Sequence, residues 1–162
     1  MSMETPLTDA TDDDASVTVS QLQAELGGSD EEATTAASDI VSEVQTQLFG
    51  DATFTFEESH VKSSLDELLL SLVGLRSSDT HGKQLLDDLA GEFDTVLSPG
   101  TVYPRLHELC DDEILEQREL VQTKEYMLAD RDEVRNEIAT AARQHLALGM
   151  VMHAALERGE FA

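Results

Sequence analysis

The fold is decided by the stretch SPGTVYPRLHELC, which occupies residues 98–110. Ser98 is a residue type that favours helix N-termini, and Pro99 suits the first helical position, where its missing N–H would have no partner anyway. Three apolar residues recur at i, i+4 and i+7, the spacing of a buried stripe on a helix: Val102, Leu106 and Leu109. The stretch therefore predicts a helix from Ser98 to about Asp112.

The rest of this helix presents hydrogen-bonding groups, with little bulk near its start. At 100° per residue, most other side chains point away from the buried stripe, and Arg105 lies near its border. They are Gly100, Thr101, Tyr103, Pro104, His107 and Glu108. Such a face suits the major groove of DNA, so we interpret the segment as a recognition helix.

The charge of the chain opposes this interpretation, because DNA is itself a polyanion. The 162 residues include 34 acidic and 10 basic side chains, a net charge of −24. Acid-rich, lysine-poor proteins are typical of cells that accumulate salt, where the Debye length falls to about 3 Å at 1 M and self-repulsion is screened. The alternative, on charge alone, is an acidic protein that avoids DNA.

Length and composition indicate one domain with an appendage. A hydrophobic content of 40% without Trp predicts an aliphatic core built from Leu-rich helices. The N-terminus lacks the basic start and apolar run of a secretory signal, and the longest nearly apolar run, 68–75, is too short to span a bilayer. We expect a cytoplasmic protein with no membrane partner.

The N-terminal part divides into two segments. Residues 1–15 are acidic and poor in bulky apolar residues, so we expect a disordered tail. Residues 16–61 are a predicted helical extension, with a helix that follows a capping box at 29–32 and ends near Phe49. The alternation at 53–56 predicts a short strand.

Residues 62–129 predict a winged helix-turn-helix of mainly α, α+β class. Two helices, at about 63–73 and 79–91, precede the recognition helix, and the short connections between the three fit a helix-turn-helix. Two strands at 114–121 and 123–128 follow and predict a small two-stranded wing.

The C-terminal segment, residues 130–162, predicts a long dimerisation helix from about Arg131 to Glu157. Its seam residues are spaced 4-3-4-3-4-3: Val134, Ile138, Ala141, His145, Leu148, Met152 and Ala155. One helix cannot bury such a seam alone, so we expect antiparallel or crossed pairing in a homodimer. Packing on the chain's own N-terminal helix is the alternative, and both are compatible.

The motif at 98–106 resembles that of the PadR family of winged-helix transcriptional regulators: Ser-Pro-Gly-Thr, an apolar residue, Tyr-Pro, any residue, then Leu. His81-Gly82 resembles the family's start of the second helix, but Lys83 stands where an aromatic residue is usual. Lys124-Glu125-Tyr126 resembles the return strand of the family's wing, with a single Lys. The resemblance covers residues 62–158 and leaves the preceding extension unexplained.

Combined with the acidic composition, this resemblance implies a haloarchaeal regulator that binds promoter DNA as a homodimer. The chain also resembles a haloarchaeal regulator of the response to reactive oxygen species, and this resemblance implies a role in oxidative stress. Nothing in the residues themselves shows that role. The alternative of a different class is an acidic winged-helix module that binds a protein without contacting DNA.

The predicted DNA contacts come from helical position and from the resemblance. On the recognition helix they are Thr101, Tyr103, Arg105 and His107, with Pro104 against the DNA backbone and Ser98 near a phosphate. Contacts to phosphates and to a minor groove are predicted for Thr80, His81, Lys83, Arg118 and Lys124. For each basic residue the alternative is a solvated surface group. We expect binding whose affinity stays flat or rises with salt, with ions bridging carboxylates to phosphates.

The sequence offers no pattern for catalysis or for a metal. It contains no phosphate loop, nucleophile elbow or metal-ligand cluster, so we expect neither an enzyme nor a cofactor. Cys110 is the single cysteine, which excludes an intramolecular disulfide. The acidic residues that follow it disfavour a thiolate, so we interpret it as a small core residue and not as an oxidant sensor.

Overall fold

The computed structural model describes residues 36–76 and 80–161. A helix over residues 36–49 comes first. The elements that follow are α2 (Glu58–Ser63), α3 (Leu65–Leu75), β1 (Thr80–His81), α4 (Gly82–Glu92), α5 (Pro99–Asp111), β2 (Leu115–Glu119), β3 (Lys124–Leu128) and α6 (Arg131–Arg158). The predicted tail at 1–15 and the capping box at 29–32 lie outside the described residues.

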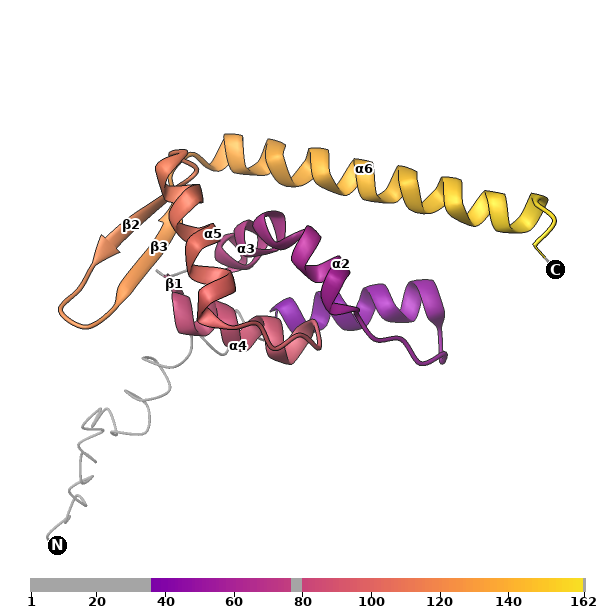
Figure 1. Cartoon of the computed structure of the whole chain (residues 1–162), viewed down its shortest axis with the longest axis horizontal. Coiled ribbons are helices and arrows are strands. Elements are labelled where there is room, and N and C mark those ends of the chain that lie inside the picture. Colours follow the sequence, from indigo (N-terminus) through magenta and orange to yellow (C-terminus); the bar gives the residue numbers. More distant parts are fainter. Residues whose placement is uncertain (1–35, 77–79, 162) are drawn as a thin grey trace, which may run out of the picture.

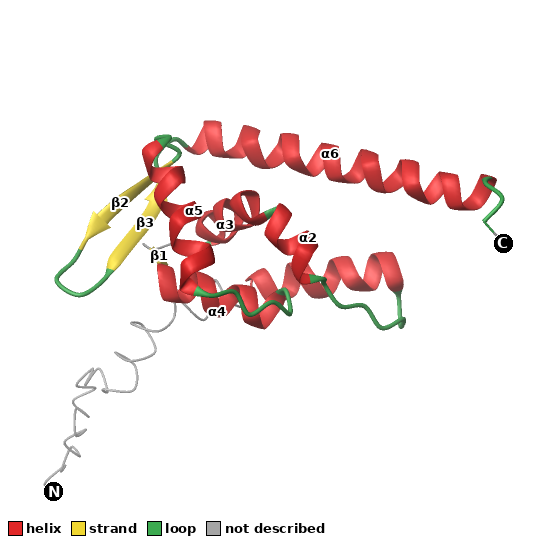
Figure 2. Ribbon diagram, viewed as in Figure 1, coloured by secondary structure: helices red, strands yellow, loops and turns green. Residues whose placement is uncertain are grey.

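The helices α3, α4 and α5 surround the core, with the sheet at one end and α6 along one side (Figure 1). The residues that fill the centre are fully buried and aliphatic: Leu69, Leu85, Leu89, Val102 and Leu106. Figure 2 shows how far helix outweighs strand, which confirms the predicted mainly α, winged helix-turn-helix class.

Helix α5 begins where the sequence predicted. Ser98 has the extended backbone of an N-cap residue, and Pro99 occupies the first helical position. The Ser98 side chain does not cap the helix backbone, since its Oγ lies 3.1 Å from Thr101 Oγ1 instead. The predicted stripe of Val102, Leu106 and Leu109 is buried, as the spacing required.

The wing belongs to a three-stranded antiparallel sheet of order β1-β3-β2, not to a two-stranded hairpin alone. Strand β1 pairs Thr80 with Tyr126 and His81 with Glu125 of β3. The second helix was predicted to start near Asp79 or Thr80, and it starts at Gly82 because this strand takes its place. The strand ties the start of α4 to the wing.

The predicted strand at 53–56 is wrong, because residues 53–57 form a loop. Phe54 stacks on Phe49 with ring centroids 4.4 Å apart, and the ring centroid of Phe56 lies 5.2 Å from that of Phe93, just after α4. The alternation of aromatic residues therefore serves packing between helices. The short helix α2 in the next stretch was not predicted.

Helix α6 divides into two halves with different surroundings. Its N-terminus is capped by Asp130, whose side chain accepts hydrogen bonds from the backbone N–H groups of Asp132 and Glu133. The first seam residue, Val134, is buried, whereas Leu148 and Met152 are 56% and 62% exposed.

None of the helices in the described ranges is long and apolar enough to cross a membrane.

Candidate nucleic-acid interface

The two flanks of α5 are both held by neighbouring helices. On one flank, the Tyr103 ring lies against the backbone of Gly82 at the start of α4. A Cβ added at Gly82 would come within 2.5 Å of Tyr103 Cε1 and 2.8 Å of its hydroxyl oxygen. The glycine is therefore required for this contact, and Tyr103 retains 37% exposure.

On the other flank, Arg105 is held by carboxylates. Its Nε donates to Asp66 Oδ1 at 2.8 Å and its Nη2 to Asp66 Oδ2 at 2.5 Å. Its Nη1 lies 3.1 Å from Oε2 of Glu108, one turn further along α5. The hydrogen bonds that Arg105 donates to Asp66, and then the charge of Asp66, raise the pKa of Arg105 above its ordinary value. The predicted base reader is thus tied to α3.

Between these flanks lies the outward face of α5. Ser98, Pro104, His107 and Glu108 are exposed there, and Thr101 is half-buried. His107 Nε2 lies 3.7 Å from Asp111 Oδ2 on the next turn. The face offers hydroxyl, imidazole and carboxylate groups and no free cation among the described residues.

Cations gather instead in a groove between the start of α4 and the wing. The groove has a volume of about 410 Å3, and its lining includes His81, Lys83, Tyr103 and Lys124. Two of the chain's three lysines therefore lie there. Lys83 is exposed, and Lys124 Nζ lies 3.9 Å from Glu119 Oε1 across the hairpin. Tyr103 joins this groove to the recognition helix.

Two of the predicted DNA contacts, the phosphate contact of Thr80 and the minor-groove contact of Arg118, lie outside the groove. The phosphate contact predicted for Thr80 is wrong, because its side chain is fully buried in β1 opposite Tyr126. Arg118 is exposed on β2 and lies opposite Glu125 in the strand register. Arg118 is not among the residues that line the groove.

Cys110 is half-buried near the C-terminal end of α5. Burial, followed by the charge of Asp111, raises the pKa of the Cys110 thiol. The thiol is thus protonated at neutral pH and a weak nucleophile, as the acidic neighbours in the sequence predicted. The described ranges also contain no group of three His, Cys, Asp or Glu side chains able to hold a metal ion.

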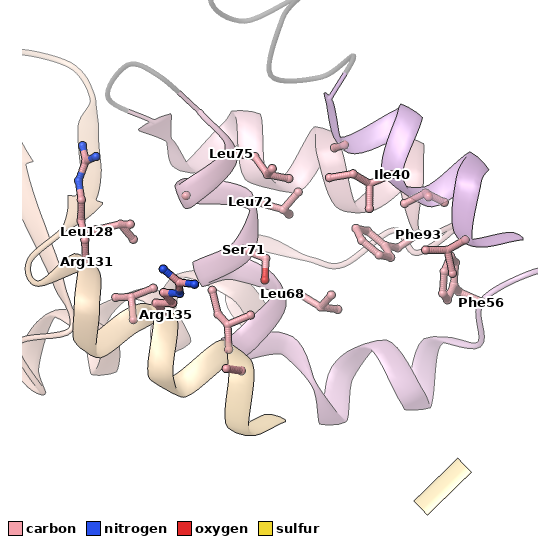
Figure 3. A pocket seen from close by; sticks show the side chains of 17 residues that line it. Ile40, Phe56, Leu68, Ser71, Leu72, Leu75, Phe93, Leu128, Arg131 and Arg135 are labelled. Carbon is pink, nitrogen blue, oxygen red and sulfur yellow. The ribbon is translucent and has the colours of Figure 1, made fainter. Parts of the chain in front are cut away.

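A second surface feature, here called the trough, lies between the helix over 36–49, α3 and α6 (Figure 3). Its volume is about 680 Å3, and its lining is apolar apart from one serine and two arginines. In Figure 3 the Arg135 side chain extends toward Ser71, while Arg131 lies apart beside Leu128. Among the described residues, no Asp or Glu lines the trough.

Sequence reasoning missed Asp66 and Gly82 as the partners that position α5. Gly82 stood in a recognised motif, but its contact with Tyr103 requires the packing of two helices. Asp66 is 39 residues from Arg105 in the sequence, and no local pattern connects them. The only signal in the sequence was that α5 has a single basic residue while α3 has acidic residues that could pair with it.

No family model matches the chain. It is 36% identical over 100 residues to the transcriptional activator GvpE of Haloferax mediterranei, which covers 62% of this chain and 52% of that protein. It is 35% identical over 118 residues to the transcriptional activator GvpE1 of Halobacterium salinarum, over 73% of this chain and 61% of the relative. The chain thus spans between half and two thirds of the length of these two relatives.

Among solved structures, the chain is similar to a PadR-like transcription factor from Bacteroides fragilis. The match has 24% identity and a TM-score of 0.44, and it covers 60% of this chain and 95% of that one.

Proposed function

We propose that this chain is a sequence-specific DNA-binding regulator of transcription that acts as a homodimer in a salt-rich cytoplasm. The observation that carries the proposal is the exposed face of α5, fixed on both flanks by α3 and α4. Beside it lies a groove that holds two of the chain's three lysines. A rigid helix presents polar groups to base edges, and the groove offers cations to phosphates. Two relatives from haloarchaea are named as transcriptional activators.

The contacts within this proposal differ in kind. Thr101 and His107 are the base readers on the outward face, with Pro104 and Ser98 against the backbone of the DNA. Lys83, Lys124 and His81 bind phosphates from the groove, with Tyr103 between the two sets. Because the chain carries 34 acidic and 10 basic side chains, molar salt must screen the acidic surface before the chain can approach DNA. Salt cations that bridge Glu108 or Glu119 to phosphates would add contacts that increase with salt.

The homodimer is proposed from the distal half of α6. Its large apolar side chains are exposed around the helix: Leu146, Leu148, Met150, Val151, Met152 and Leu156 are 56–68% exposed. So many exposed apolar side chains on one helix segment are unusual on a monomer and support an interaction site there. In a two-fold dimer the same patch serves both copies, and two recognition helices then lie about one DNA turn apart.

The trough is the surface of this chain that suits the partner's distal α6. The described residues that line it are mostly apolar and include no carboxylate, and it lies beside the proximal half of α6. A second copy that inserts its distal α6 into the trough would cover both unpartnered surfaces at once. Ile40, which lines the trough and is 47% exposed, then becomes buried in the dimer.

A role in oxidative stress belongs to this proposal only through the resemblance to the regulator of reactive oxygen species. The half-buried Cys110, whose thiol pKa is raised, does not support a cysteine sensor on this chain. A Cys110→Ala variant that binds DNA but no longer responds to peroxide would establish one.

The DNA-binding proposal is tested by mobility shift on promoter fragments in molar KCl. Lys83→Ala removes a groove cation and is expected to weaken binding, whereas Lys62→Ala removes an exposed lysine on α2, which pairs with Glu58 at 2.8 Å, and serves as the control. His107→Ala is expected to relax sequence preference. Absence of binding by the wild type at every salt concentration would favour the protein-binding module instead.

The dimer is tested by light scattering on two variants with equal changes in net charge. The double variant Leu148→Glu, Met152→Glu places charges on the seam, and Arg143→Glu changes the charge equally on the opposite side of α6. We expect a monomer from the first and a dimer from the second. A dimer from both would exclude the distal α6 as the interface.

A further inference from the structure

The recognition helix carries one basic residue, and the fold keeps that residue occupied. Arg105 is the only Lys or Arg in α5. Each of its three guanidinium nitrogens has a carboxylate oxygen within 3.1 Å: Nε and Nη2 contact Asp66, and Nη1 contacts Glu108. The three groups together carry a net charge of −1, so the cluster repels phosphate.

This geometry competes directly with the way arginine reads DNA. Arginine recognises guanine through two parallel N–H donors aimed at O6 and N7, and it binds phosphate through the same fork. In this chain the Nε and Nη2 donors of Arg105 already form that fork with Asp66. A guanine or phosphate contact would require Arg105 to leave at least one carboxylate.

The other cations of the winged helix differ in this respect. Lys83 forms no ion pair with the described residues, and Lys124 has only Glu119 at 3.9 Å. The cations of the groove are therefore available to phosphates, whereas the one cation of α5 is not. Withholding a cation from the recognition helix removes a contact that DNA of any sequence could use, because phosphates are the same in all of them, and so it lowers non-specific affinity.

We propose that Asp66 and Glu108 withhold Arg105 from DNA, so that Arg105 positions α5 on α3 and Asp66 limits non-specific binding by the recognition helix. This inference rests on the proposed function and refines it: Arg105 moves from the predicted base readers to the residues that position the helix. Asp66 becomes a determinant of specificity although it does not touch DNA. The ratio of specific to non-specific affinity is then set partly from α3.

The test is the salt dependence of binding to a random-sequence duplex and to a promoter fragment, measured with the full chain. Asp66→Asn frees Arg105, and one additional phosphate contact makes the slope of log affinity against log salt more negative by about 0.9. The expected gain in random-duplex affinity relative to wild type is about eightfold for each tenfold decrease in KCl. Promoter affinity is expected to gain less than this, so the ratio of specific to non-specific affinity falls.

Two controls separate release of Arg105 from simple loss of a negative charge. Asp87→Asn removes the same charge from an exposed position on α4 that forms no ion pair with the described residues. It is expected to leave the slope unchanged, and so is Asp66→Glu, which retains the carboxylate. In the double variant Asp66→Asn, Arg105→Gln the slope is expected to return to the wild-type value.

The outcomes distinguish this inference from the proposed function. A wild type that binds DNA, with an Asp66→Asn slope equal to that of wild type or of Asp87→Asn, overturns the inference alone. A steeper slope that persists in the double variant overturns it too, because Arg105 would then not be the group released. Failure of both wild type and Asp66→Asn to bind any duplex overturns the proposed function and the inference together.

Discussion

Helix α3 is joined to its two neighbours by ion pairs of the same chemistry in opposite surroundings. Arg76, just after α3, contacts Asp88 of α4 through Nη2 and Oδ2 at 2.8 Å, with side chains only 3% and 6% exposed. Arg105 of α5 contacts Asp66 of α3 at 2.5 Å, with side chains 45% and 31% exposed. The first pair lies in the protein interior and the second in salt solution. Burial, not distance, therefore decides what each pair contributes.

The buried pair gives the largest predicted effect. Asp88→Ala removes a carboxylate from a buried guanidinium, and breaking such a pair costs about 3–5 kcal/mol of unfolding free energy. Chemical denaturation in molar KCl measures the loss. The neighbouring Asp87 is exposed, and Asp87→Ala is expected to change stability by no more than about 0.5 kcal/mol. If the two variants lost the same unfolding free energy, the Arg76–Asp88 ion pair would not stabilise the interior.

Those two adjacent aspartates also show how far the sequence predicts this fold. Helix α5, its buried stripe, the two strands of the wing hairpin and helix α6 were predicted correctly, because each depends on patterns that repeat within the element itself. Asp87 and Asp88 are identical in such a pattern, and only the packing of α4 on α3 buries one of them. The same holds for Thr80, which the sequence placed at a phosphate and the sheet buries. Contacts with residues distant in the sequence therefore decide which of these polar side chains is buried, and local periodicity does not.

The candidate site follows the same division. The outward orientation of Pro104 and His107 follows from their angles on the helix, and the structure shows both exposed. Arg105 lay near the border of the stripe, where a side chain can turn toward DNA or toward a neighbouring helix. Asp66 decides between these two, and its proximity arises only when α3 and α5 cross.

A third contact between helices joins α4 and α5 without any charged group, and it can be compared with the two ion pairs. Gly82→Ala places a methyl group 2.5 Å from Tyr103 Cε1, so the ring must move. Overpacking typically costs about 1–3 kcal/mol, and the partly exposed ring can swing outward, so we expect about 1 kcal/mol. Tyr103→Ala should remove most of this penalty in the double variant. A penalty for Gly82→Ala that is unchanged beside Tyr103→Ala would place the strain elsewhere.

The exposed pair gives the smallest effect and the most informative one. Asp66→Ala is expected to cost about 0.2–1 kcal/mol in dilute salt, because exposed pairs gain little Coulomb energy and water solvates both partners. In molar KCl the Debye length falls to about 3 Å, comparable with the contact itself, so the loss should approach zero. Denaturation of Asp66→Ala and Asp88→Ala across a series of KCl concentrations measures both. The Asp88 variant should lose nearly the same free energy at every concentration, because ions do not enter the interior. If the loss of unfolding free energy in the Asp66 variant were instead the same at every KCl concentration, the Arg105 cluster would stabilise the fold by packing. Asp66 and Glu108 would then affect DNA binding only through the position of α5.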